Sequence, residues 1–211
     1  MSHRLRLLGR ASSINVRKVL WTLDETGLPH EHEPWGEGAL SLQSPEFLAL
    51  NPLGMVPVLV DGGAVLRESN TLCRYLAAKA GRTDLLPDEA VARARVEQWM
   101  DWQATELNNS WRYAFMGLVR KSPAHQDEAL LAQGLQGWNA QMAVLEAQLQ
   151  HTGAFAVGPR FSLADVVLGL SVERWLRTPQ AQRPGYPAIE AYHARLCERP
   201  AFLRHGANGL P

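Results

Sequence analysis

A proline inside a short apolar run is the feature that most restricts how this chain can fold. The run Met55–Val60 is short, apolar and rich in valine, which is typical of a buried strand. Pro57 lies within it, although proline has no N–H to donate to a sheet ladder. Both observations are satisfied if Pro57 stands at the first position of the strand and the Val56–Pro57 bond is cis. Such a turn would leave the backbone of Val56 free to bind something other than a strand.

The residues after this run predict a hairpin and then a helix. Asp61–Gly63 is a strong hairpin signal, and Ala64–Leu66 reads as the second strand. Glu68–Thr71 then begins a helix whose apolar positions share one face: Leu72, Tyr75 and Leu76. A strand edge with unused backbone groups is thereby placed beside a helix N-terminus rich in hydroxyls. This arrangement favours a site for a small, extended, anionic ligand.

The N-terminal segments predict a strand followed by an amphipathic helix. Leu5–Leu8 is the strand, and Gly27 ends the helix, whose apolar positions follow i, i+3, i+4, i+7 spacing: Val16, Val19, Leu20 and Leu23. Ser12, Ser13 and Asn15 stand at its start, where short polar side chains cap unpaired N–H groups. From local sequence alone, capping is their simpler interpretation.

The next segments complete a βαβαββα order, which predicts a thioredoxin-like domain over residues 1–80. His30–Pro34 is the second strand, and Trp35–Leu50 is a loop with a short helical turn. Alternation puts His30 and His32 on one face of that strand. Two imidazoles can bind a metal, but no third ligand is evident, so we expect solvated histidines and no metal.

Residues 81–87 read as a linker, and residues 88–211 as an all-helical domain. We expect one long helix over Asp88–Arg120 and an antiparallel one over His125–Gln150, with a bundle-packing stripe: Leu131, Leu135, Trp138, Met142, Leu145 and Leu149. Ser162 and Asp165 form a capping-box pair at the start of another helix, between the hydrophobic staple residues Phe161 and Val166. Pro187–Glu198 is the last clear helix, ended by Arg199-Pro200.

Composition excludes several classes of partner. Lys plus Arg and Asp plus Glu number 21 each, so net charge offers no reason to bind nucleic acid or an anionic membrane. No apolar run approaches the roughly 18 residues that span a bilayer, and residues 1–20 lack the apolar region of a signal peptide. Cys73 and Cys197 are unpatterned, so we expect neither a disulfide framework nor a zinc site, and a cytoplasmic location.

The run NPLGMVPVLVDGG…LRESNTLCRYLA resembles the glutathione-binding half of the cytosolic glutathione S-transferases, and the similarity extends over nearly the whole chain. The pattern looks like the bacterial, serine-type, theta/phi-like members. The resemblance implies a detoxification enzyme that uses glutathione as co-substrate, and a two-fold homodimer in which the thioredoxin-like domain packs against the partner's helical domain. The glutathione contacts that it implies are Ser12, Asn15, Met55, Val56, Pro57, Glu68 and Ser69.

The resemblance also implies a catalytic serine at the first strand-to-helix turn. Alignment of SSINVRKV by its arginine puts Ser13 in that role, with Ser12 as the fallback and Asn15 in support. Lowering a thiol pKa from about 8.5 by roughly two units takes about 2.7 kcal/mol. One hydrogen bond to a charged group contributes about 1.5–3 kcal/mol, and a helix N-terminus about 0.3–1 kcal/mol. A serine hydroxyl therefore suffices.

Two departures from related patterns matter for the chemistry. The turn carries no cysteine, which excludes a mixed disulfide between enzyme and glutathione at this position. Gly54 and Met55 stand where serine-type relatives offer His or Gln, so the group that holds the glycine carboxylate of glutathione is unassigned; Gln43 is a weak candidate.

We expect the electrophile pocket between the domains, with these candidates: Trp102, Glu106, Trp111, Tyr113 and Phe115. About half of them should belong to the bundle core, because an aromatic stripe at helical spacing usually does. The first function hypothesis is an enzyme that conjugates or isomerises small hydrophobic electrophiles with glutathione. The second is a non-catalytic binding or interaction module of the same fold.

Overall fold

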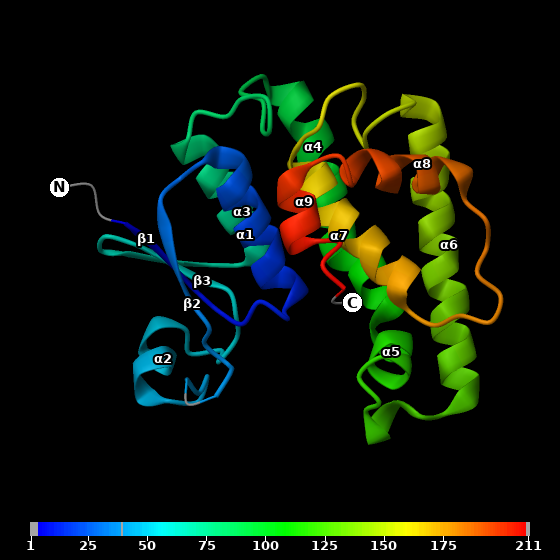
Figure 1. The fold of residues 1–211 in the computed structure, drawn as a ribbon, viewed down its shortest axis with the longest axis horizontal. Coiled ribbons are helices and arrows are strands. Elements are labelled where there is room, and N and C mark those ends of the chain that lie inside the picture. The colour runs from blue at the N-terminus through cyan, green and yellow to red at the C-terminus, as the bar shows by residue number, and fades with distance from the viewer. Residues whose placement is uncertain (1–3, 39, 210–211) are drawn as a thin grey trace. The chain divides into compact units, whose positions relative to one another are not determined.

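The computed structural model describes residues 4–38 and 40–209, and contacts between Cα atoms divide the chain into two compact units. The first unit runs up to Leu86 and the second begins at Pro87. The first unit has the predicted βαβαββα order (Figure 1). Its elements are β1 (Leu5–Leu8), α1 (Ile14–Thr26), β2 (His30–Glu33), α2 (Pro45–Leu50), β3 (Val58–Asp61), β4 (Ala64–Arg67) and α3 (Ser69–Lys79).

The strands form one mixed sheet in the order β2-β1-β3-β4. β1 pairs in parallel with β2 and antiparallel with β3, which pairs antiparallel with β4 through the predicted hairpin. Figure 1 shows α1 and α3 on one side of the sheet and α2 on the other. Phe47 of α2 packs against Leu8 and Val58, and all three side chains are fully buried. β3 begins one residue after Pro57, so the proline does not interrupt the ladder.

Gly9 permits a close approach that the turn between β1 and α1 requires. Its φ of +149° lies in a region that favours glycine. A Cβ atom at this position would lie 2.6 Å from Val16 Cγ2 and 2.9 Å from Val56 Cβ. Gly9 therefore packs closely against both the start of α1 and the segment that carries Val56.

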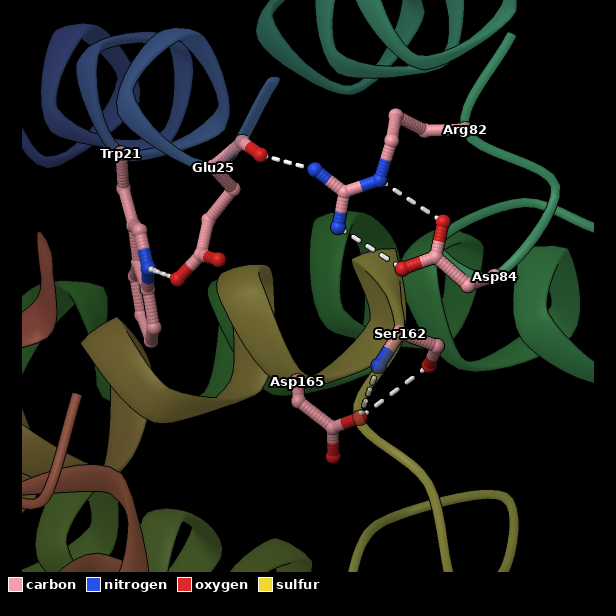
Figure 2. A network of polar contacts seen from close by, with 6 residues as sticks. All are labelled: Trp21, Glu25, Arg82, Asp84, Ser162 and Asp165. Carbon is pink, nitrogen blue, oxygen red and sulfur yellow. Dashed lines mark hydrogen bonds and ion pairs between the residues drawn. The ribbon is translucent and has the colours of Figure 1, made fainter. Parts of the chain in front are cut away.

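The first unit is also tied together after α3, where Arg82 connects to the end of α1 (Figure 2). Its Nε and Nη2 each donate to Asp84 at 2.7 Å, and its Nη1 donates to the carbonyl of Glu25. Glu25 in turn accepts a hydrogen bond of 2.9 Å from the Trp21 indole. These contacts fix the chain beyond α3 against α1.

The second unit is helical, as predicted, although three of its elements, η1, η2 and α9, were not expected from the sequence. Its elements are α4 (Ala90–Trp102), the π-helical stretch η1 (Gln103–Leu107), α5 (Asn108–Leu118), the 3₁₀ turn η2 (Pro123–His125), α6 (Glu128–Thr152), α7 (Leu163–Arg177), α8 (Pro187–Leu196) and α9 (Pro200–His205). The long helix expected over Asp88–Arg120 is present as one continuous helical stretch over residues 90–118, and η1 is a π-helical insertion within it that was not predicted. A last helix, α9, follows α8: Pro200 stands at its first turn, where a missing N–H costs nothing.

The predicted stripe on α6 forms the centre of this helical core. Trp138, Met142, Leu145 and Leu149 are buried, whereas Leu131 and Leu135 are half-buried. Gly134 of α6 lets α5 approach closely, since a Cβ there would lie 3.3 Å from the Cβ of Ala114.

The predicted capping box at the start of α7 is confirmed (Figure 2). The backbone N–H of Ser162 donates to Asp165 Oδ2 at 2.8 Å, and the Ser162 hydroxyl donates to the same oxygen at 3.1 Å. Asp165 Oδ1 accepts from the backbone N–H of Ala156 at 2.8 Å and from the Tyr192 hydroxyl at 3.1 Å. Burial raises the Asp165 pKa from 3.8 to about 6, although these donors oppose the shift. The carboxylate thus joins α7, α8 and the loop before α7.

Candidate functional site

An open depression of about 360 Å³ lies in the first unit. It is formed where the loop before β3, the end of β4 and the first turns of α1 and α3 meet. The residues that line it are Asn15, Asn51, Leu53, Met55, Val56, Pro57, Arg67, Glu68 and Ser69. Six of these, Asn15, Met55, Val56, Pro57, Glu68 and Ser69, were predicted from the sequence.

The loop before β3 is organised by the side chain of Asn51, which is only 3% exposed. Asn51 Nδ2 donates to the carbonyl of Met55 at 2.7 Å, and Oδ1 accepts from the N–H of Leu53 at 3.2 Å. Arg67 Nη1 donates to the same oxygen at 3.3 Å. The Val56–Pro57 peptide bond that follows is cis, which confirms the prediction. The sequence analysis missed Asn51, although an Asn-Pro pair is itself a turn signal.

The first turn of α3 carries a backbone outlier. Glu68 has φ +67° and ψ +109°, a conformation that residues other than glycine rarely adopt. Such outliers cost of order 1–3 kcal/mol and cluster at functional sites. Ser69 follows it, is 8% exposed, and its hydroxyl donates to Asn15 Oδ1 at 3.3 Å. The starts of α1 and α3 are thereby joined at the depression.

Ser13 stands at the N-cap position of α1, with extended backbone angles of φ −83° and ψ 123°. Its side chain makes no capping hydrogen bond within the described part of the chain. Capping was the simpler interpretation of this hydroxyl from local sequence, and the geometry does not support it. The Ser12 hydroxyl donates to Glu37 Oε1 at 3.4 Å. Both serines lie on the turn that precedes Asn15, and neither is among the residues that line the depression.

Charged groups of both signs stand side by side at the depression. Arg67 and Glu68 are exposed and consecutive in the chain, and neither makes an ion pair with any described residue. Gln43 lies near the loop before β3, because its Nε2 is 2.8 Å from where a Cβ on Gly54 would stand. Gly54 has φ +61°, so glycine suits this position for its backbone as well.

The two histidines of β2 are hydrogen-bonded to the backbone. His32 Nε2 donates to the carbonyl of Gly9 at 2.6 Å, and His30 Nδ1 lies 3.1 Å from the carbonyl of Leu28. Among residues 4–38 and 40–209, no three His, Cys, Asp or Glu side chains are grouped so that they could hold a metal ion. The same residues include no helix long and apolar enough to cross a bilayer.

The five candidate electrophile contacts differ in exposure within the helical unit. Trp111 and Phe115 are buried, with ring centroids 5.3 Å apart in an edge-to-face arrangement. The Arg174 guanidinium lies over both rings, 4.6 Å and 4.1 Å from their centroids, so this pair belongs to the core. Trp102 and Tyr113 are half-buried, and Glu106 is exposed on the π-helical stretch. Single-turn π-bulges are frequent at functional sites.

Comparisons with known proteins cover both units. Residues 7–84 match the family of the glutathione S-transferase N-terminal domain, and residues 109–200 match that of the C-terminal domain. The chain is 36% identical over 202 residues to the Escherichia coli (strain K12) protein named glutathione S-transferase GstB, covering 95% of this chain and 96% of that one. It is 31% identical over 200 residues to elongation factor 1-gamma 3 of rice (Oryza sativa subsp. japonica), covering 90% of this chain but 45% of that protein.

A solved structure resembles the whole chain. It is the theta class glutathione S-transferase from Xanthomonas axonopodis pv. citri with glutathione bound, with a TM-score of 0.90, 35% identity and 100% coverage of each chain. The mixed four-stranded sheet of the first unit and the helical second unit agree with these matches. The chain therefore belongs to the glutathione S-transferase family.

Proposed function

We propose that glutathione occupies the depression of the first unit, and that the enzyme holds its thiol as a thiolate for attack on small hydrophobic electrophiles. The observation that supports this most directly is the grouping of Val56, Pro57, Glu68 and Ser69 around one depression, since the family resemblance assigns these residues to glutathione. The similar Xanthomonas structure contains bound glutathione. No metal is needed for this chemistry.

In this binding mode the peptide lies along the strand edge at Val56. The backbone of Val56 pairs with the cysteinyl part of glutathione, beside Met55 and Pro57. The γ-glutamyl end reaches Glu68 and Ser69 at the start of α3, where the Ser69 hydroxyl already contacts Asn15. The glycine end then points toward Gln43, whose amide lies beside Gly54.

Ser13 is the group that we propose stabilises the thiolate. Its hydroxyl makes no capping hydrogen bond to a described residue and stands at the N-terminus of α1, where the helix dipole also favours an anion. Ser12 fits this role less well because its hydroxyl donates to Glu37. Asn15, two residues into the helix region, supports the site through its side-chain amide.

For the electrophile, we propose contacts from the accessible members of the aromatic set. Trp102, Glu106 and Tyr113 are the exposed or half-buried ones, and the buried Trp111 and Phe115 support them from the core. A homodimer and a cytoplasmic location stay predictions from the sequence and the resemblance. Sedimentation at micromolar concentration tests the former, and a monomer there would contradict it.

Retention on immobilised glutathione together with turnover of a generic aryl halide tests the proposal. We expect both, with elution by free glutathione. A protein that neither binds the resin nor shows glutathione binding by calorimetry would contradict the proposed ligand.

A non-catalytic module of the same fold is the second candidate. It is favoured by the 31% identity to elongation factor 1-gamma 3, of which the matched region is 45%. Binding of glutathione without turnover of aryl halides or of isomerisable substrates would favour this alternative. Turnover of an isomerisable substrate alone would indicate a glutathione-dependent isomerase.

A further inference from the structure

One end of the depression presents a cation and an anion on consecutive residues. Arg67 is the last residue of β4, and Glu68 precedes the first residue of α3. Both side chains are exposed, and neither is neutralised by an ion pair with a described residue. Among the lining residues, all of which are described, Arg67 is the one cationic side chain.

The position of Arg67 is constrained by a buried partner. Its Nη1 donates to Asn51 Oδ1 at 3.3 Å, and Asn51 is 3% exposed. An arginine guanidinium carries five N–H donors in a planar fork that matches a carboxylate. One donor is used on Asn51, so the fork retains donors for an anion in the depression.

We propose that Arg67 adds a contact to the γ-glutamyl end of glutathione, which the family resemblance places at Glu68 and Ser69. Arg67 binds the α-carboxylate, toward which the Ser69 hydroxyl turns from Asn15 Oδ1, while Glu68 faces the α-ammonium. This inference rests on the proposed function, since it assumes that glutathione occupies the depression. The γ-glutamyl end carries both charges on a single carbon, and two adjacent side chains of opposite sign complement it. The glycine end carries only a carboxylate, which Glu68 would repel.

The conformation of Glu68 supports this assignment. With φ at +67°, the chain turns sharply between the side chain of Arg67 and the first turn of α3. Glu68 itself lines the depression with Arg67 and Ser69. Three consecutive residues therefore present a cation, an anion and a hydroxyl to one ligand end.

Calorimetry on Arg67→Gln with three ligands tests the proposal. The ligands are glutathione, its monoethyl ester on the glycine carboxylate, and the analogue in which hydrogen replaces the γ-glutamyl α-carboxylate. We expect Arg67→Gln to weaken binding of the first two by roughly ten-fold, because a charge-assisted contact is lost. Binding of the third ligand should not change, since it lacks the group that Arg67 holds. Arg67→Lys should fall between, because it keeps the charge but not the fork.

Arg4→Gln is the matched control, because it removes one exposed positive charge from the same unit away from the depression. An equal loss for all three ligands would overturn the proposal in favour of a structural role through Asn51. An effect that disappears with the monoethyl ester would overturn it in favour of the glycine carboxylate. If the wild type binds glutathione and Arg67→Gln matches Arg4→Gln, the role of Arg67 fails alone. If the wild type binds none of the ligands, the proposed function fails as well.

Discussion

Replacement of Ser13 by alanine separates stabilisation of the helix from stabilisation of the thiolate. Loss of an N-cap side chain typically costs about 1 kcal/mol of stability. The Ser13 side chain makes no capping hydrogen bond within the described residues, so we expect Ser13→Ala to lower the free energy of unfolding by less than that. The backbone capping contact is retained, since the Ser13 carbonyl accepts from the N–H of Arg17 at 3.0 Å.

The loss should appear in the chemistry of bound glutathione. A hydrogen bond to a charged group contributes about 1.5–3 kcal/mol, which corresponds to roughly one to two pKa units. The pKa of the bound thiol should therefore rise by about that amount in Ser13→Ala, and kcat/KM near neutral pH should fall roughly 10- to 100-fold. Glutathione affinity should change less, because Val56, Glu68 and Ser69 are unaltered.

Titration of the far-ultraviolet absorbance of the thiolate, with glutathione bound, measures this pKa directly. Ser12→Ala is the matched control, since it removes the neighbouring hydroxyl that donates to Glu37. A titration that shifts in Ser12→Ala and not in Ser13→Ala would assign the role to Ser12. If neither variant moves it, the hydroxyl mechanism is refuted, and the helix N-terminus or Asn15 must stabilise the anion.

Three further outcomes follow from the geometry. Ser69→Ala should weaken glutathione binding by about 1.5–3 kcal/mol in calorimetry, since one charge-assisted bond is lost; unchanged affinity would show that the γ-glutamyl end lies elsewhere. Gly9→Ala should lower the free energy of unfolding by about 1–3 kcal/mol in urea, because its Cβ would lie 2.6 Å from Val16 Cγ2. Gly63→Ala should change it far less, because a Cβ there would have no described atom within 4 Å apart from its chain neighbours. Because burial raises the Asp165 pKa to about 6, the native state binds its proton more tightly than the unfolded chain does, so the stability that this proton contributes is lost as pH rises through 6. The unfolding free energy of the wild type, relative to Asp165→Asn, should therefore fall between about pH 4 and pH 6; a rise would show that the four hydrogen-bond donors outweigh burial.

The features predicted correctly from the sequence are those set by local rules. Pro57 cannot donate to a ladder, so its place before β3 and its cis bond follow from one residue type. Asp61–Gly63 favours a hairpin wherever it lies between apolar runs. The helical period of α6 was visible in the sequence because residues that face a core are apolar, and four of its six stripe residues are buried in one core.

One of the features that were missed depends on a contact between distant residues. The π-helical stretch η1 places the side chain of Gln103, which is 1% exposed, where its amide donates to Ser171 Oγ at 3.1 Å. No local signal in Gln103–Leu107 predicts a partner 68 residues away. Helix α9 was missed for a different reason: Pro200 was interpreted as a stop, although proline is equally suited to the first turn of a new helix.

The residues of the candidate site also divide into those with a local sequence signal and those that only the fold reveals. Val56, Glu68 and Ser69 stand in a motif that a single sequence displays. Arg67 stands directly before that motif on an exposed strand position, where its residue type alone indicates only a solvated charge. The structure adds two observations. Arg67 Nη1 donates to Oδ1 of the buried Asn51 at 3.3 Å, and neither Arg67 nor Glu68 makes an ion pair with a described residue. An exposed charge that has a buried hydrogen-bond partner but no counter-ion is therefore a better guide to a ligand contact than its residue type.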